Sequence, residues 1–220
     1  MRAMFRRAGK AALAALALIG ASVPATAQLL LYPPAYPSGP IEPTDPLVGI
    51  PLPGATPAEA RARLIWNLRS GLNVAALQCQ FSPYLRTVDN YNAFLAHHSR
   101  ELAAAYAAIE GYFRRVHGAR NGPRRFDDYS TQTYNNFSTL QAQLGFCQTA
   151  ARIGRAALAS PKGQLFTVAQ ARMRELRASL VAVPEDYYFN RMPVPLAPLA
   201  LGAADCSALR GRERRECEGN

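Results

Sequence analysis

Hydrophobic residues recur at spacings of three and four along most of the middle of the chain. The clearest stripe runs from Tyr91 to Val116, where the steps alternate strictly between four and three. Such a stripe is typical of an amphipathic helix that buries one face. Similar stripes cover residues 57–80, 123–160 and 166–181, and no stretch alternates as a strand does. The pattern predicts an all-α protein, an antiparallel four-helix bundle with long second and third helices.

Local signals set the ends of these helices. Thr56, Pro57 and Glu59 form a capping box with proline at the first helical position, which starts the first helix. Gly118 is expected to end the second helix, and Pro161 stops the third. Asp127 and Asp128 lie near the predicted start of the third helix, where carboxylates stabilise the helix dipole.

Proline-rich segments flank the bundle on both sides. We divide the chain into a leader at residues 28–55, a helical bundle domain at 56–183 and a tail at 184–220. Because proline fixes φ and lacks a donor, both flanks are predicted to be extended. The leader either lies across the outside of the folded domain or remains free of it.

The first 27 residues have the pattern of a secretory signal peptide. Basic residues precede an apolar run from Ala11 to Val23, and Ala25-Thr26-Ala27 gives a cleavage site before Gln28. The run is shorter than the roughly 20 residues that a transmembrane helix needs. The sequence therefore predicts a periplasmic or secreted protein that is not an integral membrane protein.

The chain is basic, and nearly all of its positive charge is arginine. Removal of the signal peptide takes four basic residues and no acidic ones, so the formal net charge falls from +10 to +6. Arginine suits carboxylates and phosphates, so acidic envelope polymers or an acidic protein are alternative partners. Because the basic residues are spread along the sequence, a solvated surface is the favoured interpretation. No nucleic-acid-binding motif is present.

Four cysteines in an exported chain favour disulfide bonds. Cys79 and Cys147 both lie on the inward stripes of the first and third helices, so a bond between them requires only that these helices touch. Cys206 and Cys217 then pair locally and close a small loop in the tail. A redox pair or zinc site is disfavoured because no two cysteines have C-x-x-C spacing.

Two groups of residues are candidate ligand sites. His97 and Glu101 lie four apart and share a helix face, and His98 falls on the core stripe, so the three are a candidate metal or ligand site. The alternative is a solvent-facing His97 with a buried, hydrogen-bonded His98. A second group is a candidate lining for a pocket between the helices, the alternative being packing at the bundle edge. Its members are Tyr91, Tyr106, Tyr112, Tyr134 and Asn136.

Catalytic motifs are missing from the sequence. It contains no G-x-S-x-G, H-E-x-x-H or Walker loop, so we predict no catalytic residue and no cofactor. The favoured function is a non-enzymatic, disulfide-stapled helical bundle that contacts an envelope or extracellular protein. The alternative is a periplasmic small-molecule- or metal-binding helical bundle.

Overall fold

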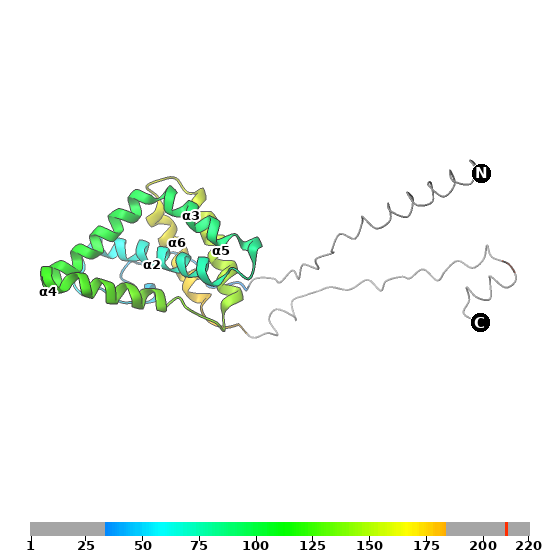
Figure 1. The fold of residues 1–220 in the computed structure, drawn as a ribbon, viewed down its shortest axis with the longest axis horizontal. Coiled ribbons are helices and arrows are strands. Elements are labelled where there is room, and N and C mark those ends of the chain that lie inside the picture. Colours follow the sequence, from blue (N-terminus) through cyan, green and yellow to red (C-terminus); the bar gives the residue numbers. More distant parts are fainter. Residues whose placement is uncertain (1–33, 184–209, 211–220) are drawn as a thin grey trace, which may run out of the picture. The chain divides into compact units, whose positions relative to one another are not determined.

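The computed structural model describes residues 34–183 and 210 (Figure 1). Within this part of the chain the protein is all-helical, as predicted, and no strand is present. The described residues form two short 3-10 helices, η1 (Pro46–Val48) and η2 (Pro83–Leu85), and the five α-helices α2 (Pro57–Gln78), α3 (Thr87–His97), α4 (Ser99–Asn135), α5 (Gln143–Ala159) and α6 (Leu165–Ala178). The predicted signal peptide and the predicted Cys206–Cys217 loop lie outside the described residues.

The central helix α2 begins where its local sequence predicts. The Thr56 hydroxyl accepts a hydrogen bond from the Glu59 backbone N–H, and the Glu59 carboxylate accepts one from the Thr56 backbone N–H. This reciprocal pair satisfies donors that a helix start leaves open. The helix then contacts α3, α4, α5 and α6, so α2 is the element around which the others pack.

The predicted continuous second and third helices are wrong. The second is broken at His98, which has φ −103° and separates α3 from α4. The third is broken by residues 136–142, where Phe137 is fully buried and Leu140 is 82% exposed. Phe137 lies against Gly71 of α2, whose missing side chain leaves room for the ring. The chain thus leaves the expected helix at residues 136–142, where the Phe137 ring packs against α2.

Gly118 makes α4 a kinked hairpin (Figure 1). Its φ of 79° and ψ of 163° reverse the chain between two helical arms, residues 99–117 and 119–135. A Cβ atom at Gly122 would lie 2.7 Å from the Arg114 Cα, so glycine allows the arms to approach closely. Asp127 and Asp128 therefore lie more than one turn beyond the start of their arm, outside the reach of the helix-dipole effect predicted for them.

The described part of the proline-rich leader contributes to the core. Ile41 and Val48 are buried in the main hydrophobic cluster with side chains of α2, α5 and α6. Ile41 also donates its backbone N–H to the Gln170 carbonyl in α6 at 3.0 Å. Residues 34–55 are therefore packed against the helices. This part of the leader is not free of the folded domain, and two of its side chains are buried in the core and do not lie on the outside.

A second hydrophobic cluster joins the α4 hairpin to α2 and the leader. Its members are Leu52, Ala62, Trp66, Ala105, Ile109, Tyr112, Phe113, Phe126 and Tyr129. Six of these residues come from the two arms of α4, so the cluster holds the hairpin closed. It also forms the floor of the pocket described below.

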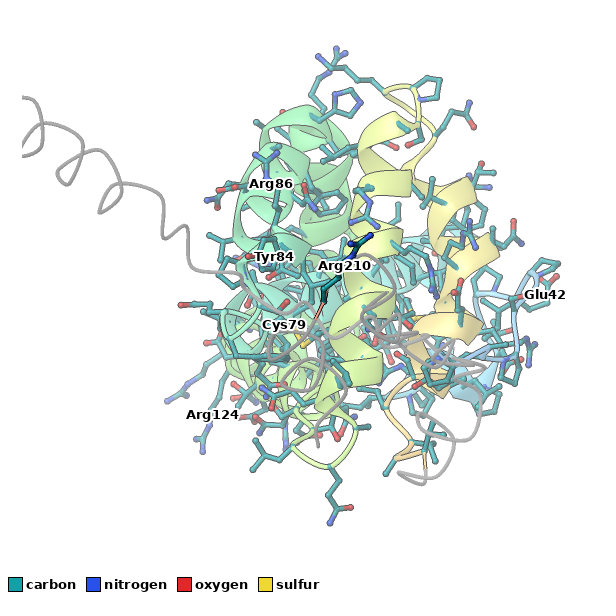
Figure 2. All side chains as sticks on the ribbon, turned by 90° about the vertical axis from the view of Figure 1, so that its right-hand side faces the viewer. Glu42, Cys79, Tyr84, Arg86, Arg124 and Arg210 are labelled. Atoms are coloured by element: carbon teal, nitrogen blue, oxygen red, sulfur yellow. A yellow bond between two sulfur atoms is a disulfide. The ribbon has the colours of Figure 1, made fainter. Side chains whose placement is uncertain are left out.

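Cys79, at the end of α2, and Cys147, in α5, have Sγ atoms 2.02 Å apart, the distance of a disulfide bond (Figure 2). These are the two cysteines that the sequence pairs. Both side chains are fully buried. No helix among residues 34–183 is long and apolar enough to cross a membrane.

Candidate functional site

A pocket of about 240 Å³ lies where the two arms of α4 meet residues 50–53 of the leader. Its apolar walls come from residues 50–53 and from Tyr112, Phe113 and Tyr129, and its polar side chains are His117, Arg125, Asp128 and Gln132. Ligand sites are commonly concave and mostly apolar, with a few convergent polar groups. The pocket has this character.

Hydrogen bonds hold the leader wall of the pocket in place. The buried Arg63 guanidinium of α2 donates to the carbonyls of Pro43, Gly49 and Ile50 at 2.6–2.8 Å. Burial lowers the pKa of Arg63, and its interaction with Tyr129 raises the pKa by a smaller amount, so the pKa is lowered overall. The Tyr112 hydroxyl donates to the Pro53 carbonyl at 2.9 Å. The backbone of this wall is therefore fixed before any ligand enters.

Arg115 ties the first arm of α4 to the start of α2. Its guanidinium lies 2.6 Å from a Glu59 carboxylate oxygen and also donates to the Gly54 carbonyl. Burial raises the pKa of Glu59, but hydrogen bonds from Arg115 and Thr56 outweigh it, so the pKa is lowered overall. Glu59 thus caps α2 and also holds Arg115 beside the pocket.

The aromatic floor of the pocket is closely packed. Phe113 packs against Tyr129 with ring centroids 5.2 Å apart, and it stacks on His117 with centroids 5.9 Å apart. Tyr129 is 4% exposed, and its hydroxyl accepts a hydrogen bond from the Asn67 side chain. Burial raises the pKa of Tyr129, so its phenol stays neutral at physiological pH.

The kink of α4 also gathers arginines. Residues 114–125 read RRVHGARNGPRR and contain five arginines. Arg114 pairs with Glu110 at 3.0 Å and Arg115 with Glu59. Arg120, Arg124 and Arg125 are exposed and form no ion pair with any carboxylate of the described residues, and Figure 2 shows Arg124 directed outward.

We call Arg114, Arg115, Arg120 and Arg124 the arginine tip. The interpretation of the basic residues as spread out overlooked this local concentration. Its signal, five arginines within twelve residues, was present in the sequence, but only the hairpin brings residues from both arms together at one place.

The structure brings His97, His98 and Glu101 close together, with the two histidine ring centroids 4.6 Å apart, but it pairs Glu101 with His98 and not with His97 as the helix spacing suggested. His98 is 1% exposed, and its Nδ1 lies 2.7 Å from the Glu101 Oε2, while its Nε2 donates to the Ala157 carbonyl at 2.9 Å. His97 Nε2 instead donates to the Ser160 carbonyl. Because the helix breaks at His98, Glu101 faces His98 and not His97.

Glu101 links the start of α4 to the loop before α6. Its carboxylate accepts hydrogen bonds from the backbone N–H groups of Gly163 and Leu165 at 2.9 and 2.8 Å. Burial raises the pKa of Glu101, but the bonds from His98, Gly163 and Leu165 outweigh it and lower the pKa overall. Among the described residues, no three histidine, cysteine, aspartate or glutamate side chains are placed to hold a metal ion.

Of the five residues predicted to line one pocket, only Tyr112 lines the pocket at the hairpin. Tyr106 is 44% exposed and packs on Trp66, and Tyr91 stacks on Phe94. The Tyr134 hydroxyl accepts a hydrogen bond from Arg69, and the Asn136 carbonyl accepts one from Arg177. These residues do not converge because the predicted straight helices are broken at His98 and at residues 136–142.

The chain matches no protein-family model, no curated protein and no solved structure, so the site is interpreted from its own geometry.

Proposed function

We propose that this chain is an exported, non-enzymatic protein of the cell envelope that binds an acidic partner protein through the arginine tip. The observation that carries the proposal is the exposure of Arg120 and Arg124 at the α4 kink without an ion pair to any described carboxylate. Unpaired guanidinium groups on a hairpin that is held closed by its own core are available to a partner. They supply electrostatic complementarity, which steers association and selects partners.

The chemistry of the tip favours carboxylates on a protein over a lipid surface. A guanidinium group binds carboxylates and phosphates alike through two parallel hydrogen bonds, so the apolar surface around the tip decides between a protein and a lipid partner. Helices that lie on membranes insert large apolar side chains beside their basic residues. Val116 is the one large apolar side chain exposed within residues 114–125 of the described chain. The tip therefore offers charge for an acidic surface but little apolar area for insertion.

The location in the envelope rests on the signal-peptide pattern, and the disulfide at Cys79 and Cys147 fits an oxidising compartment. Expression of the full chain in a bacterium, followed by mass spectrometry of the product, tests export. We expect a mature chain that begins near Gln28 in the periplasmic or extracellular fraction. A product that keeps Met1 and stays in the cytoplasm would contradict export.

Binding to defined acidic probes tests the partner class. The probes are poly-L-glutamate, vesicles of anionic phospholipid and an acidic polysaccharide, measured with the mature chain at about 150 mM salt, where exposed charges more than about 8 Å apart are largely screened. We expect poly-L-glutamate to bind best and the double variant Arg120→Gln/Arg124→Gln to weaken that binding by about tenfold.

A matched control separates the tip from net charge. Arg100 and Arg155 are exposed arginines of α4 and α5 outside the tip, so Arg100→Gln/Arg155→Gln removes the same charge elsewhere. The control variant should bind poly-L-glutamate within about twofold of the wild type, because it leaves the local field of the tip intact. Equal losses in both variants, or stronger binding to vesicles or polysaccharide, would refute the proposal of an acidic protein partner.

A further inference from the structure

We infer that the pocket between the arms of α4 and residues 50–53 binds a small zwitterion that carries an aromatic ring, the chemistry of a free aromatic amino acid. This function goes beyond contact with a partner protein and uses different residues. Arg125 and Asp128 supply the two charges, and the aromatic floor supplies the ring contact.

The first argument is that two opposite charges line one pocket without pairing. Arg125 and Asp128 lie three apart in a helical arm, so their side chains share a face. Neither side chain has an ion pair or hydrogen bond to another side chain of residues 34–183. A ligand with both charges satisfies both groups at once.

A pair with the same chemistry elsewhere in the chain behaves differently. Arg172 and Glu175 in α6 are also an arginine and a carboxylate three residues apart within a helix, and their side chains meet at 3.0 Å. The spacing therefore permits an ion pair. At the pocket, Arg125 and Asp128 both line the cavity but no ion pair joins them, which leaves a site for a carboxylate and a site for an ammonium group on one wall.

The second argument is the shape and polarity of the remaining walls. Tyr112, Phe113 and Tyr129 present aromatic surface, and aromatic rings pack favourably in offset or edge-to-face arrangements. The volume of about 240 Å³ lies below the range of roughly 300–1,000 Å³ that is common for drug-sized ligands. The occupant is therefore a small metabolite with one ring.

The third argument is that ligands with a single charge fit the pocket less well than a zwitterion. A plain carboxylate would bind Arg125 but would face the Asp128 carboxylate without a partner for it. A plain amine would face Arg125, with the arginine tip close by in the sequence. Because each of these ligands gains one attractive charge contact and meets one repulsive charge at short range, both should bind more weakly than the zwitterion.

Isothermal titration with four probes tests the inference. L-phenylalanine carries both charges and a ring, 3-phenylpropionate lacks the ammonium, 2-phenylethylamine lacks the carboxylate and L-alanine lacks the ring. We expect L-phenylalanine to bind about tenfold or more tightly than each of the other three, which corresponds to one charge-assisted hydrogen bond or one buried ring.

Adjacent residues provide matched controls for the variants. Arg125→Gln and Asp128→Asn should each weaken L-phenylalanine binding by about tenfold or more. Arg124→Gln and Asp127→Asn remove the same charges from exposed neighbours that do not line the pocket, and they should change binding by less than about twofold. Unchanged circular dichroism and thermal midpoints show that each variant is folded.

The outcomes separate this inference from the proposed function. Arg120→Gln/Arg124→Gln should weaken poly-L-glutamate binding and spare L-phenylalanine, whereas Asp128→Asn should do the reverse. Three results would overturn the zwitterion site. The first is that L-phenylalanine, L-tyrosine and L-tryptophan all fail to bind saturably at concentrations up to about 10 mM, which corresponds to a binding free energy weaker than about −2.7 kcal/mol. The others are equal binding of 3-phenylpropionate and equal losses in the Arg124 and Arg125 variants.

Discussion

Replacing both Cys79 and Cys147 with alanine should lower the free energy of unfolding by about 4 kcal/mol. The disulfide joins residues separated by 68 positions, and it therefore closes a long loop in the unfolded chain. In the chain-entropy model a loop of this length restricts the unfolded state by about 15 cal/mol/K, which is about 4 kcal/mol at 25 °C. Because domains of this size are stable by about 5–15 kcal/mol, the loss removes a large part of the stability.

Urea denaturation followed by circular dichroism measures this loss. The wild type is unfolded with and without dithiothreitol, and the double alanine variant is treated in the same way. The reduced wild type keeps both buried sulfur atoms, so its difference from the oxidised form isolates the effect of the covalent bond from the effect of packing. We also expect the urea dependence of the unfolding free energy to rise when the bond is absent, since the freed chain exposes more surface.

Two results would refute this reasoning. The first is a wild-type midpoint that does not change on reduction, because the bond would then contribute nothing to stability. The second is a difference between wild type and alanine variant that is as large when both are measured in dithiothreitol as when both are measured without it, because packing and not loop closure would then be the cause. The alanine variant itself should be insensitive to dithiothreitol.

Three further substitutions test the contacts around the site. Glu101→Gln should lower the unfolding free energy by about 1–3 kcal/mol at pH 7, measured by urea denaturation. The pKa of Glu101 is lowered from its ordinary 4.5 in the folded state, so its contribution is full above pH 4.5 and is lost as the pH falls through the lowered value. The difference between wild type and variant should therefore shrink in acid, and a constant difference would contradict the pKa assignment. Gly122→Ala should cost about 1–3 kcal/mol, because its Cβ would lie 2.7 Å from the Arg114 Cα. The control Gly111→Ala meets no atom within 4 Å and should be neutral or stabilising, so equal thermal midpoints for the two variants would argue against close packing of the arms. Arg63→Met should cost at least about 2 kcal/mol and expose residues 34–55 to limited proteolysis, since three leader carbonyls lose their donor; a leader that stays protected would show that Arg63 does not hold it.

Local chemistry in the sequence determined the helical class, the start of α2 and the choice of cysteine partners. The capping box at Thr56 and Glu59 acts between residues three apart, so it can be identified without knowledge of the fold. Cys79 and Cys147 could be paired because both lie on apolar stripes of helices that pack together. Of the candidate pocket residues, Tyr112 alone was identified in this way.

Only the tertiary structure decided where the long helices break, where the leader lies and which side chains meet at the pocket. At the first break, the His98 ring binds the Ala157 carbonyl, which lies 59 residues further along the chain. At the second break, Phe137 fills the space beside Gly71. The leader enters the core because Arg63 satisfies carbonyls that burial would otherwise leave unpaired. These contacts join distant parts of the chain, and helical periodicity reports only the neighbours within one or two turns. The same periodicity continues through His98 and Leu140, so the sequence pattern alone could not show that the chain turns there.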